Sequence, residues 1–131
     1  MDGELSKIKL SEDYTPSENE EYMSTKQLEY FSLKLKSMLD ELEKQELEDN
    51  SIGTYYSAEY SGSEKLIKRR KERKEKIKEA LEKIKLGTYG YCDGTGEEIG
   101  VERLEANPLA IYCIEEQERI EKEKNIYNTD D

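Results

Sequence analysis

Histidine and tryptophan are absent from this 131-residue chain, phenylalanine occurs once, and there are only two cysteines. Without histidine the chain lacks the commonest general base and the usual partner of a serine or cysteine nucleophile. Carboxylates are numerous, but they are scattered along polar stretches, and nothing marks one pair of them as a catalytic dyad. The sequence therefore predicts a protein that is not an enzyme.

Hydrophobic residues are also scarce, at 34%, whereas charged residues reach 40%. This composition argues against a large core and favours extended, solvated helices in a single domain. No apolar run approaches the roughly 20 residues of a membrane helix, so we expect no membrane partner. The net charge of −11 argues against a DNA-binding protein, because general nucleic-acid binding needs a basic face. Two cysteines and no secretory signal are typical of a cytoplasmic protein.

Residues 20–86 have the pattern of an antiparallel two-helix coiled-coil hairpin. Ser24 and Gln27 form a capping box, which predicts the start of the first helix. Apolar residues then recur three and four positions apart, as in a heptad seam: Leu28, Phe31, Leu35, Met38 and Leu42. A second helix is predicted from about residue 63 to residue 86, with Ile67, Ile77, Leu81 and Ile84 along its seam.

The two predicted helices carry opposite charge. Residues 64–85 hold eleven Lys/Arg and five Asp/Glu, a net of +6, whereas residues 20–50 hold four Lys and nine Asp/Glu, a net of −5. Arms of opposite sign attract each other and disfavour pairing of like arms between molecules, so we expect a monomer. The common interpretation of such a basic run is a solvated helix face that neutralises its neighbour.

Three segments lack helical periodicity. Residues 1–19 are polar and are predicted to be a flexible N-terminal arm, and residues 126–131 a frayed tail. Residues 49–63 contain two glycines and four serines, which predicts a tip loop between the helices. The tip residues Tyr55, Tyr56, Glu59 and Tyr60 either pack over the helix ends or form an exposed contact surface.

Residues 87–125 contain both cysteines, five glycines and the spacing of a zinc knuckle. Cys92 and Cys113 stand where two Cys-x-x-Cys knuckles would begin, and Thr95 and Glu116 occupy the other two ligand positions. Restoring cysteine at both would give the four-thiolate spacing of a structural zinc site. This segment is therefore predicted to be a small zinc-finger-like module followed by a C-terminal helix from residue 113.

Three alternatives remain for the module. Zinc bound by Cys92, Cys113 and the Glu116 carboxylate would be held more weakly than by four thiolates, and Thr95 is a poor ligand. A disulfide between the cysteines would be unusual in the cytoplasm. We expect instead that no zinc is bound and that hydrogen bonds and a small core hold the module, with Thr95 capping its turn. That core would consist of Ile99, Leu104 and Ile114.

Two separated blocks of the chain resemble the DksA/TraR family of bacterial regulators. The first block is Glu20-Glu21-Tyr22-Met23 followed by Gln27-Leu28-Glu29-Tyr30-Phe31. The second comprises Tyr89-Gly90-Tyr91-Cys92, Ile99-Gly100, Arg103-Leu104-Glu105-Ala106, Pro108 and Cys113-Ile114-Glu115. The resemblance covers roughly residues 12–125 and implies an all-α fold, in which a coiled-coil hairpin carries a zinc-finger-like module and a C-terminal helix.

The family resemblance implies a hairpin that enters the secondary channel of RNA polymerase. Its tip would bring an Asp-x-x-Asp-x-Ala motif near the catalytic magnesium, and guanosine tetraphosphate would bind between regulator and polymerase. Residues 49–63 lack that motif and hold only Asp49 and Glu59 as acids, and the arms look shorter by about two helical turns each. Lys76 matches a family lysine, but Asn107 and Gln117 replace residues that are commonly basic. The chain therefore has few of the cations with which the family binds guanosine tetraphosphate.

Two arginines, Arg69 and Arg103, match family arginines and are candidates for polymerase contact, along with Lys76. Ordinary ion pairing with neighbouring carboxylates is the competing interpretation of both arginines. The family resemblance implies a transcription regulator that acts through RNA polymerase and is linked to the stringent response. The alternative is a structural or interaction coiled coil that keeps the fold and has lost control of polymerase.

Overall fold

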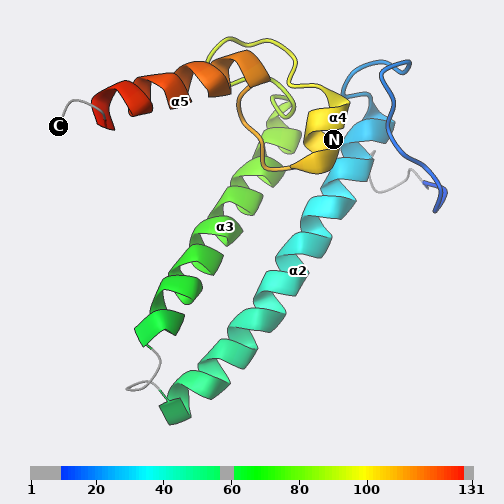
Figure 1. Ribbon diagram of the computed structural model, residues 1–131. Helices are drawn as coiled ribbons and strands as arrows, with labels where there is room; N and C mark the ends of the chain where they lie inside the picture. The colour runs from blue at the N-terminus through cyan, green and yellow to red at the C-terminus, as the bar shows by residue number, and fades with distance from the viewer. Residues whose placement is uncertain (1–9, 57–60, 129–131) are drawn as a thin grey trace.

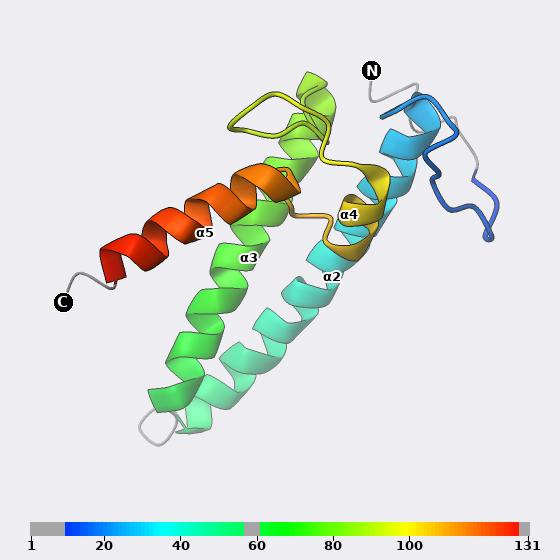
Figure 2. The same ribbon diagram turned by 45° about the horizontal axis from the view of Figure 1, so that its top comes forward.

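The computed structural model describes residues 10–56 and 61–128, and the side chains of residues 49–63 and 127–128 lie outside that description (Figure 1). The described helices are α2 (Thr25–Tyr56), α3 (Ser61–Leu86), α4 (Val101–Ala106) and α5 (Ile114–Asn128). Helices α2 and α3 run antiparallel as a hairpin, and α4 and α5 lie at its base, the end at which α2 begins and α3 ends (Figures 1 and 2). The predicted all-α hairpin with a C-terminal helix is confirmed.

Helix α2 begins where the capping box predicts. The backbone N–H of Gln27 donates to the Ser24 hydroxyl at 3.3 Å, and the Gln27 side-chain oxygen accepts from the backbone N–H of Met23 at 2.8 Å. Met23 has a φ of 50°, which is uncommon for a residue with a side chain and turns the chain sharply into the helix. The Ser24 hydroxyl thus accepts from one N–H that the first helical turn leaves without a partner, and the fully buried Gln27 side chain bonds the backbone just before the helix.

The buried core is concentrated at the base of the hairpin. Helix α2 contributes Phe31, Leu35 and Leu42, and α3 contributes Ile77 and Ile84, all from the predicted seams. The module completes this core with Tyr89, Cys92, Ile99, Val101, Leu104 and Cys113. The module therefore belongs to the same hydrophobic unit as the hairpin base.

Beyond Leu42 and Ile77 the contact between the two arms becomes polar. Lys74, at a seam position of α3, donates to the Glu46 carboxylate at 3.0 Å, and both side chains are partly buried. This ion pair stands where a heptad seam ordinarily places an apolar residue. In the described part of the hairpin the two arms are therefore joined by packing near the base and by an ion pair at Lys74 and Glu46.

The prediction of a tip loop over residues 49–63 is wrong at both ends. Helix α2 continues through Tyr56 and α3 starts at Ser61, so Tyr55 and Tyr56 lie in the last turn of α2. Glu59 and Tyr60 lie outside the described residues. Gly53 did not end the helix because one interior glycine costs only about 1 kcal/mol relative to alanine. The expected shortening of the arms relative to the family stays a prediction.

The prediction of a flexible arm over residues 1–19 is also wrong for the part that the structure describes. Tyr14 donates to Glu20 at 2.8 Å, and its ring packs edge-on against Tyr30 of α2. The backbone carbonyl of Ser17 accepts a hydrogen bond from Gln27 at 3.1 Å. Residues 14–20 therefore fold back along the first turns of α2, whereas residues 1–9 lie outside the described part of the chain.

Helix α5 projects sideways from the base and away from the hairpin (Figures 1 and 2). It continues through Asn128, three residues past the predicted helix end at residue 125. Ile114 is 53% exposed, so it does not join the core as expected, because α5 leaves the module at that residue. In the described part of the chain no helix is long and apolar enough to cross a membrane.

Candidate functional site

The module is built on a short backbone turn between Gly90 and Ile99. The N–H of Cys92 donates to the Glu97 carbonyl at 2.7 Å, and the N–H of Ile99 donates to the Gly90 carbonyl at 2.8 Å. One isolated antiparallel bridge joins Tyr91 and Glu98. These backbone bonds close the turn without a bound metal ion.

The ligand positions hold an alternative set of contacts. Cys92 and Cys113 are both buried as free thiols, so the disulfide alternative is not formed. The Thr95 hydroxyl lies 3.9 Å from the Cys113 sulfur and accepts from the backbone N–H of Glu97 at 3.3 Å. Thr95 thus caps the turn, as the sequence predicted.

The fourth position, Glu116, is buried and its carboxylate is already engaged. Arg119 donates to it from Nε at 2.7 Å and from a terminal nitrogen, one helical turn farther along α5. The Glu116 side chain also lies over Gly94, where an added Cβ would come within 2.9 Å of two of its carbon atoms. Glu116 therefore fills space in the module and pairs with a cation.

These residues do not fit a structural zinc ion. Zinc in such sites takes four nitrogen or sulfur ligands, and only two thiols are present here. Asp93, the other nearby acid, pairs with Lys83 of α3 at 2.7 Å. Across the described residues there is no group of three His, Cys, Asp or Glu side chains able to hold a metal ion. Cys92 and Cys113 remain the two residues at which the family's metal would be bound.

The environment of Cys92 acts on its thiol in two directions. Burial favours the neutral form, but hydrogen bonds from the Thr95 side chain and from backbone N–H groups, including that of Cys113, favour the thiolate. The net effect lowers the pKa of Cys92 to about 7. The hydrogen bonds of the turn therefore stabilise the thiolate of Cys92, although the four ligands of a structural zinc site are not present.

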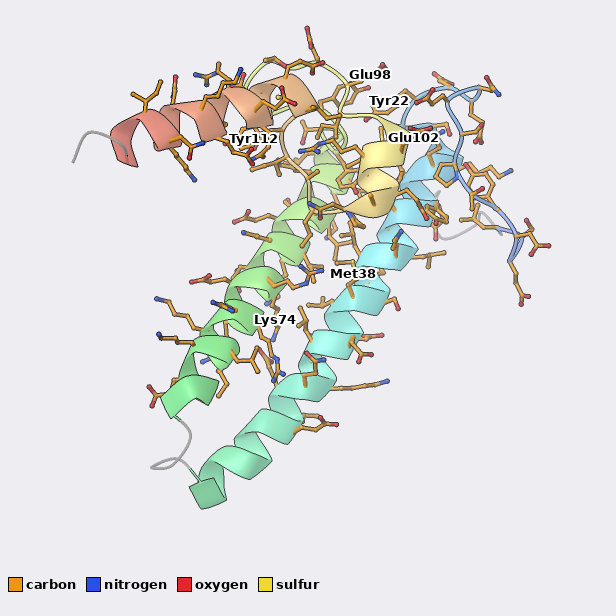
Figure 3. All side chains as sticks on the ribbon, viewed as in Figure 1. Tyr22, Met38, Lys74, Glu98, Glu102 and Tyr112 are labelled. Atoms are coloured by element: carbon orange, nitrogen blue, oxygen red, sulfur yellow. The ribbon has the colours of Figure 1, made fainter. Side chains whose placement is uncertain are left out.

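Tyr22 fastens the module to the start of α2. Its hydroxyl donates to the Gly90 carbonyl at 2.5 Å and accepts from the Gly100 N–H at 2.9 Å, so one phenol links both ends of the turn (Figure 3). Burial raises the pKa of Tyr22 and keeps the hydroxyl protonated as a donor. An edge-on contact with the Tyr91 ring holds the Tyr22 ring in place.

Helix α4 makes a second attachment to the hairpin. The Glu105 carboxylate accepts from the Tyr30 hydroxyl at 2.6 Å and lies 3.2 Å from the Lys34 ammonium group. Lys34 also donates to the Glu105 backbone carbonyl at 2.9 Å. Together with Tyr22, these contacts fix the orientation of the module relative to the arms.

The candidate partner-binding residues fall into two places. Lys76 and Arg103 line a cavity of about 310 Å³ between α3 and the module, together with Asn107 and Gln117. Arg103 donates from Nε to the Tyr112 carbonyl at 3.0 Å, a bond to the backbone that differs from the competing interpretation of an ion pair with a carboxylate. Arg69 lies apart from them, exposed in a separate groove between α2 and α3.

Comparison with known proteins identifies this arrangement. Residues 87–122 match the sequence profile of the prokaryotic dksA/traR C4-type zinc finger. The RNA polymerase-binding transcription factor DksA of Caulobacter vibrioides is 37% identical over 131 residues, covering 90% of this chain and 92% of that protein. The chain belongs to the DksA/TraR family. DksA of Escherichia coli K12 is 32% identical over 117 residues, covering 79% and 78%.

Solved structures of the DksA/TraR family have the same fold. The transcription factor DksA2 from Pseudomonas aeruginosa superposes with a TM-score of 0.72 at 32% identity, covering 79% of this chain and 90% of that one. The RNA polymerase binding protein and transcriptional regulator Dks from Chlamydia trachomatis gives a TM-score of 0.51 at 29% identity. Both of these solved proteins are named as transcription factors or regulators.

Two functional contacts were not predicted from sequence. Tyr22 lies within the family block, but nothing in its neighbourhood indicated a bond to Gly90 across 68 positions. Arg119 was overlooked, although its spacing of three from Glu116 on a predicted helix is the usual signal for an ion pair.

Proposed function

We propose that this protein is a transcription regulator that binds RNA polymerase through its secondary channel. The observation that carries the proposal is the match over 90% of the chain to an RNA polymerase-binding transcription factor, on a hairpin whose base and module are intact. The hairpin supplies the reach, because the 32 residues of α2 extend about 48 Å at 1.5 Å per residue.

The direct test is binding of the purified protein to purified core RNA polymerase. We expect saturable binding that a DksA relative displaces in competition. No binding to polymerase, from a protein whose circular dichroism shows a folded helical hairpin, would refute the proposal. That outcome would favour the alternative of an interaction protein that keeps the fold alone.

We further propose that polymerase binding and full regulatory activity are separable in this protein. Residues 49–63 hold only two acids, Asp49 and Glu59, without the spaced acidic pair that the family resemblance implies near the catalytic magnesium. Tyrosine does not replace them, because a neutral phenol is a far poorer ligand for a hard cation than a carboxylate.

Transcription in vitro from a promoter that a DksA relative represses tests this separation. We expect little repression by this protein alone, and relief of the relative's repression as this protein is added. Repression equal to the relative's at matched occupancy of polymerase would contradict the separation and would leave the binding proposal intact.

We infer that guanosine tetraphosphate contributes little to polymerase binding. Lys76 and Arg103 share the cavity beside the module, but Arg103 is already bonded to a backbone carbonyl, and Asn107 and Gln117 are uncharged. A nucleotide with several phosphates is bound chiefly by cations. Polymerase binding measured with and without the nucleotide should change by less than about 3-fold, which corresponds to less than 1 kcal/mol.

We also propose that the module folds without zinc. The support is the contact set at the ligand positions, where Glu116 pairs with Arg119 and Thr95 caps the backbone turn. Metal analysis of the purified protein should give far less than one zinc per chain, and a chelator should leave the melting temperature unchanged. One tightly held zinc per chain, with unfolding on chelation, would contradict the proposal.

A matched variant sharpens the zinc test. Replacing the two altered ligand positions, Thr95→Cys with Glu116→Cys, restores four thiolates at the family spacing. The variant is expected to take up one zinc per chain and to become sensitive to chelator, which shows that the assay detects a zinc-dependent fold. A wild type that behaves like the variant would overturn the assignment.

A further inference from the structure

Two buried thiols lie close together in the module. Cys92 and Cys113 are the only cysteines of the sequence, and they are 3% and 4% exposed as free thiols. The Thr95 side chain hydrogen-bonds the Cys92 sulfur, and its hydroxyl lies 3.9 Å from the Cys113 sulfur. The backbone N–H of Cys113 also donates to the Cys92 sulfur. One hydroxyl and one amide therefore hold the two sulfurs in the same small region of the module.

No third metal ligand stands ready beside these sulfurs. Glu116 occupies a family ligand position, but its carboxylate pairs with Arg119. Asp93, which follows Cys92, pairs with Lys83 of α3 at 2.7 Å. The sequence contains no histidine, and in the part of the chain that the structure describes no three His, Cys, Asp or Glu side chains form a metal-binding group. The site therefore offers a pair of sulfur donors.

This donor set discriminates among metal ions by softness and by coordination number. Zinc in structural sites takes four nitrogen or sulfur ligands, and calcium and magnesium take six or more oxygen ligands. Soft thiolate ligands select Cu(I), a monovalent ion that is stable between two sulfurs. A pair of thiols without a third ligand is therefore suited to Cu(I) and poorly suited to zinc.

We propose that Cys92 and Cys113 bind one Cu(I) ion as a pair of thiolates. The metal enters as Cu(I) and keeps its oxidation state, and the thiol protons are released to solvent as the two sulfur–copper bonds form. Hydrogen bonds from the backbone N–H groups of Gly94, Thr95 and Cys113 to the Cys92 sulfur form the outer shell that orients this ligand.

The cover over the two sulfurs is thin enough to admit an ion. Both Thr95 and Gly96 of the turn are exposed, in contrast to the cysteines beneath them. Gly96 has no side chain, and an added Cβ there would meet nothing within 4 Å. A metal ion therefore reaches the sulfurs past a single threonine side chain, without opening the core.

The first test is a titration of the reduced, zinc-free protein with Cu(I) under anaerobic conditions, in competition with the chromophoric chelator bicinchoninate. We expect one copper per chain. Cys92→Ser and Cys113→Ser should each weaken binding at least ~100-fold, the upper end of what loss of an outer-shell bond costs, because each removes a ligand. Glu116→Gln is the matched control, since it keeps both thiols, and it should change the affinity less than ~3-fold.

X-ray absorption spectroscopy of the copper-loaded wild type identifies the ligands even if the cysteine variants fail to fold. The expected spectrum is that of Cu(I) with two sulfur neighbours, in a protein that sediments as a monomer.

Four results would overturn the proposal: no Cu(I) taken from the chelator, an oxygen ligand together with weak binding by Glu116→Gln, copper shared between two chains, or displacement of the copper by excess zinc. None of these measurements involves RNA polymerase, so the copper site stands or fails independently of the proposed function.

Discussion

Gly90 is the position at which a single methyl group should do the most damage to the module. Its φ is +90°, and an added Cβ would lie 2.9 Å from both Cγ and Sδ of Met23 and 3.1 Å from the Tyr22 hydroxyl oxygen. Gly87 also has a positive φ, +78°, but a Cβ there meets nothing within 4 Å. Comparing Gly90→Ala with Gly87→Ala therefore separates the steric overlap from the backbone cost that both share.

The magnitudes follow from two contributions. A side chain in the left-handed region costs about 1–2 kcal/mol, and the stiffer unfolded chain returns about 0.4–1 kcal/mol, so Gly87→Ala should destabilise by roughly 0.5–1 kcal/mol. Overlap with the buried Met23 adds about 1–3 kcal/mol at Gly90, for a total of roughly 2–4 kcal/mol. With an entropy of unfolding of about 2.1 cal/mol/K per residue, Gly87→Ala should lower the melting temperature by about 2–4 °C and Gly90→Ala by about 7–14 °C.

The measurement is urea and thermal denaturation of both variants, followed by circular dichroism. Adding Met23→Ala should cost less in the Gly90→Ala background than in the wild type, because removing the methionine side chain relieves the overlap. Equal destabilisation by the two glycine variants, or additive effects of the methionine change, would show that Gly90 is not in the close contact described.

Three further predictions concern single groups. Tyr22→Phe should destabilise by about 1–3 kcal/mol in urea denaturation, because the Gly100 N–H loses its acceptor, whereas Tyr91→Phe keeps the neighbouring ring and should cost under about 0.5 kcal/mol. Lys74→Ala should speed amide exchange in the tip half of α2 and α3 more than at the base, and uniform exchange would contradict this. Burial raises the pKa of Tyr30 to about 12, so the folded state keeps a proton that the unfolded state loses near pH 10. The free energy of unfolding should therefore fall as pH rises from about 10 to 12. Circular dichroism measures the unfolding, and tyrosinate absorbance measures the loss of the proton.

Much of the fold was predictable because its core follows a local period. Phe31, Leu35 and Leu42 recur at heptad spacing and are all buried, and Ile77 and Ile84 mirror them on the second arm. Such periodicity depends only on residues three and four positions apart, so the sequence contains it directly.

The errors in prediction have physical causes too. Turn-forming residues near the tip suggested a loop, but helix α2 carries Gly53 because neighbouring turns outweigh one poor helix former. Ile114 was expected in the core because it is apolar, yet α5 turns away from the module there and leaves it exposed.

The module contacts were the hardest to foresee. Tyr22 and Gly90 are 68 positions apart, and no local pattern links a phenol to a carbonyl at that separation. The zinc spacing, in contrast, located the turn correctly even though the residues at two ligand positions make other contacts. Spacing predicted the backbone, whereas the identity of the contacts needed the three-dimensional arrangement.

Because the packing is concentrated at the base, the hairpin is held at one end and extends from it toward the tip. Among the described side chains of α3, the last fully buried one toward the tip is Ile77, and Ser61 lies 16 residues beyond it, or about 24 Å at 1.5 Å per residue. Over that length a rotation of about 5° at the base moves the start of α3 by about 2 Å. Shifts of this size at interfaces separate functional states in other proteins. A substitution around Tyr22, Gly90 or Glu105 would therefore steer where the far end of the hairpin lies, without touching any residue near it.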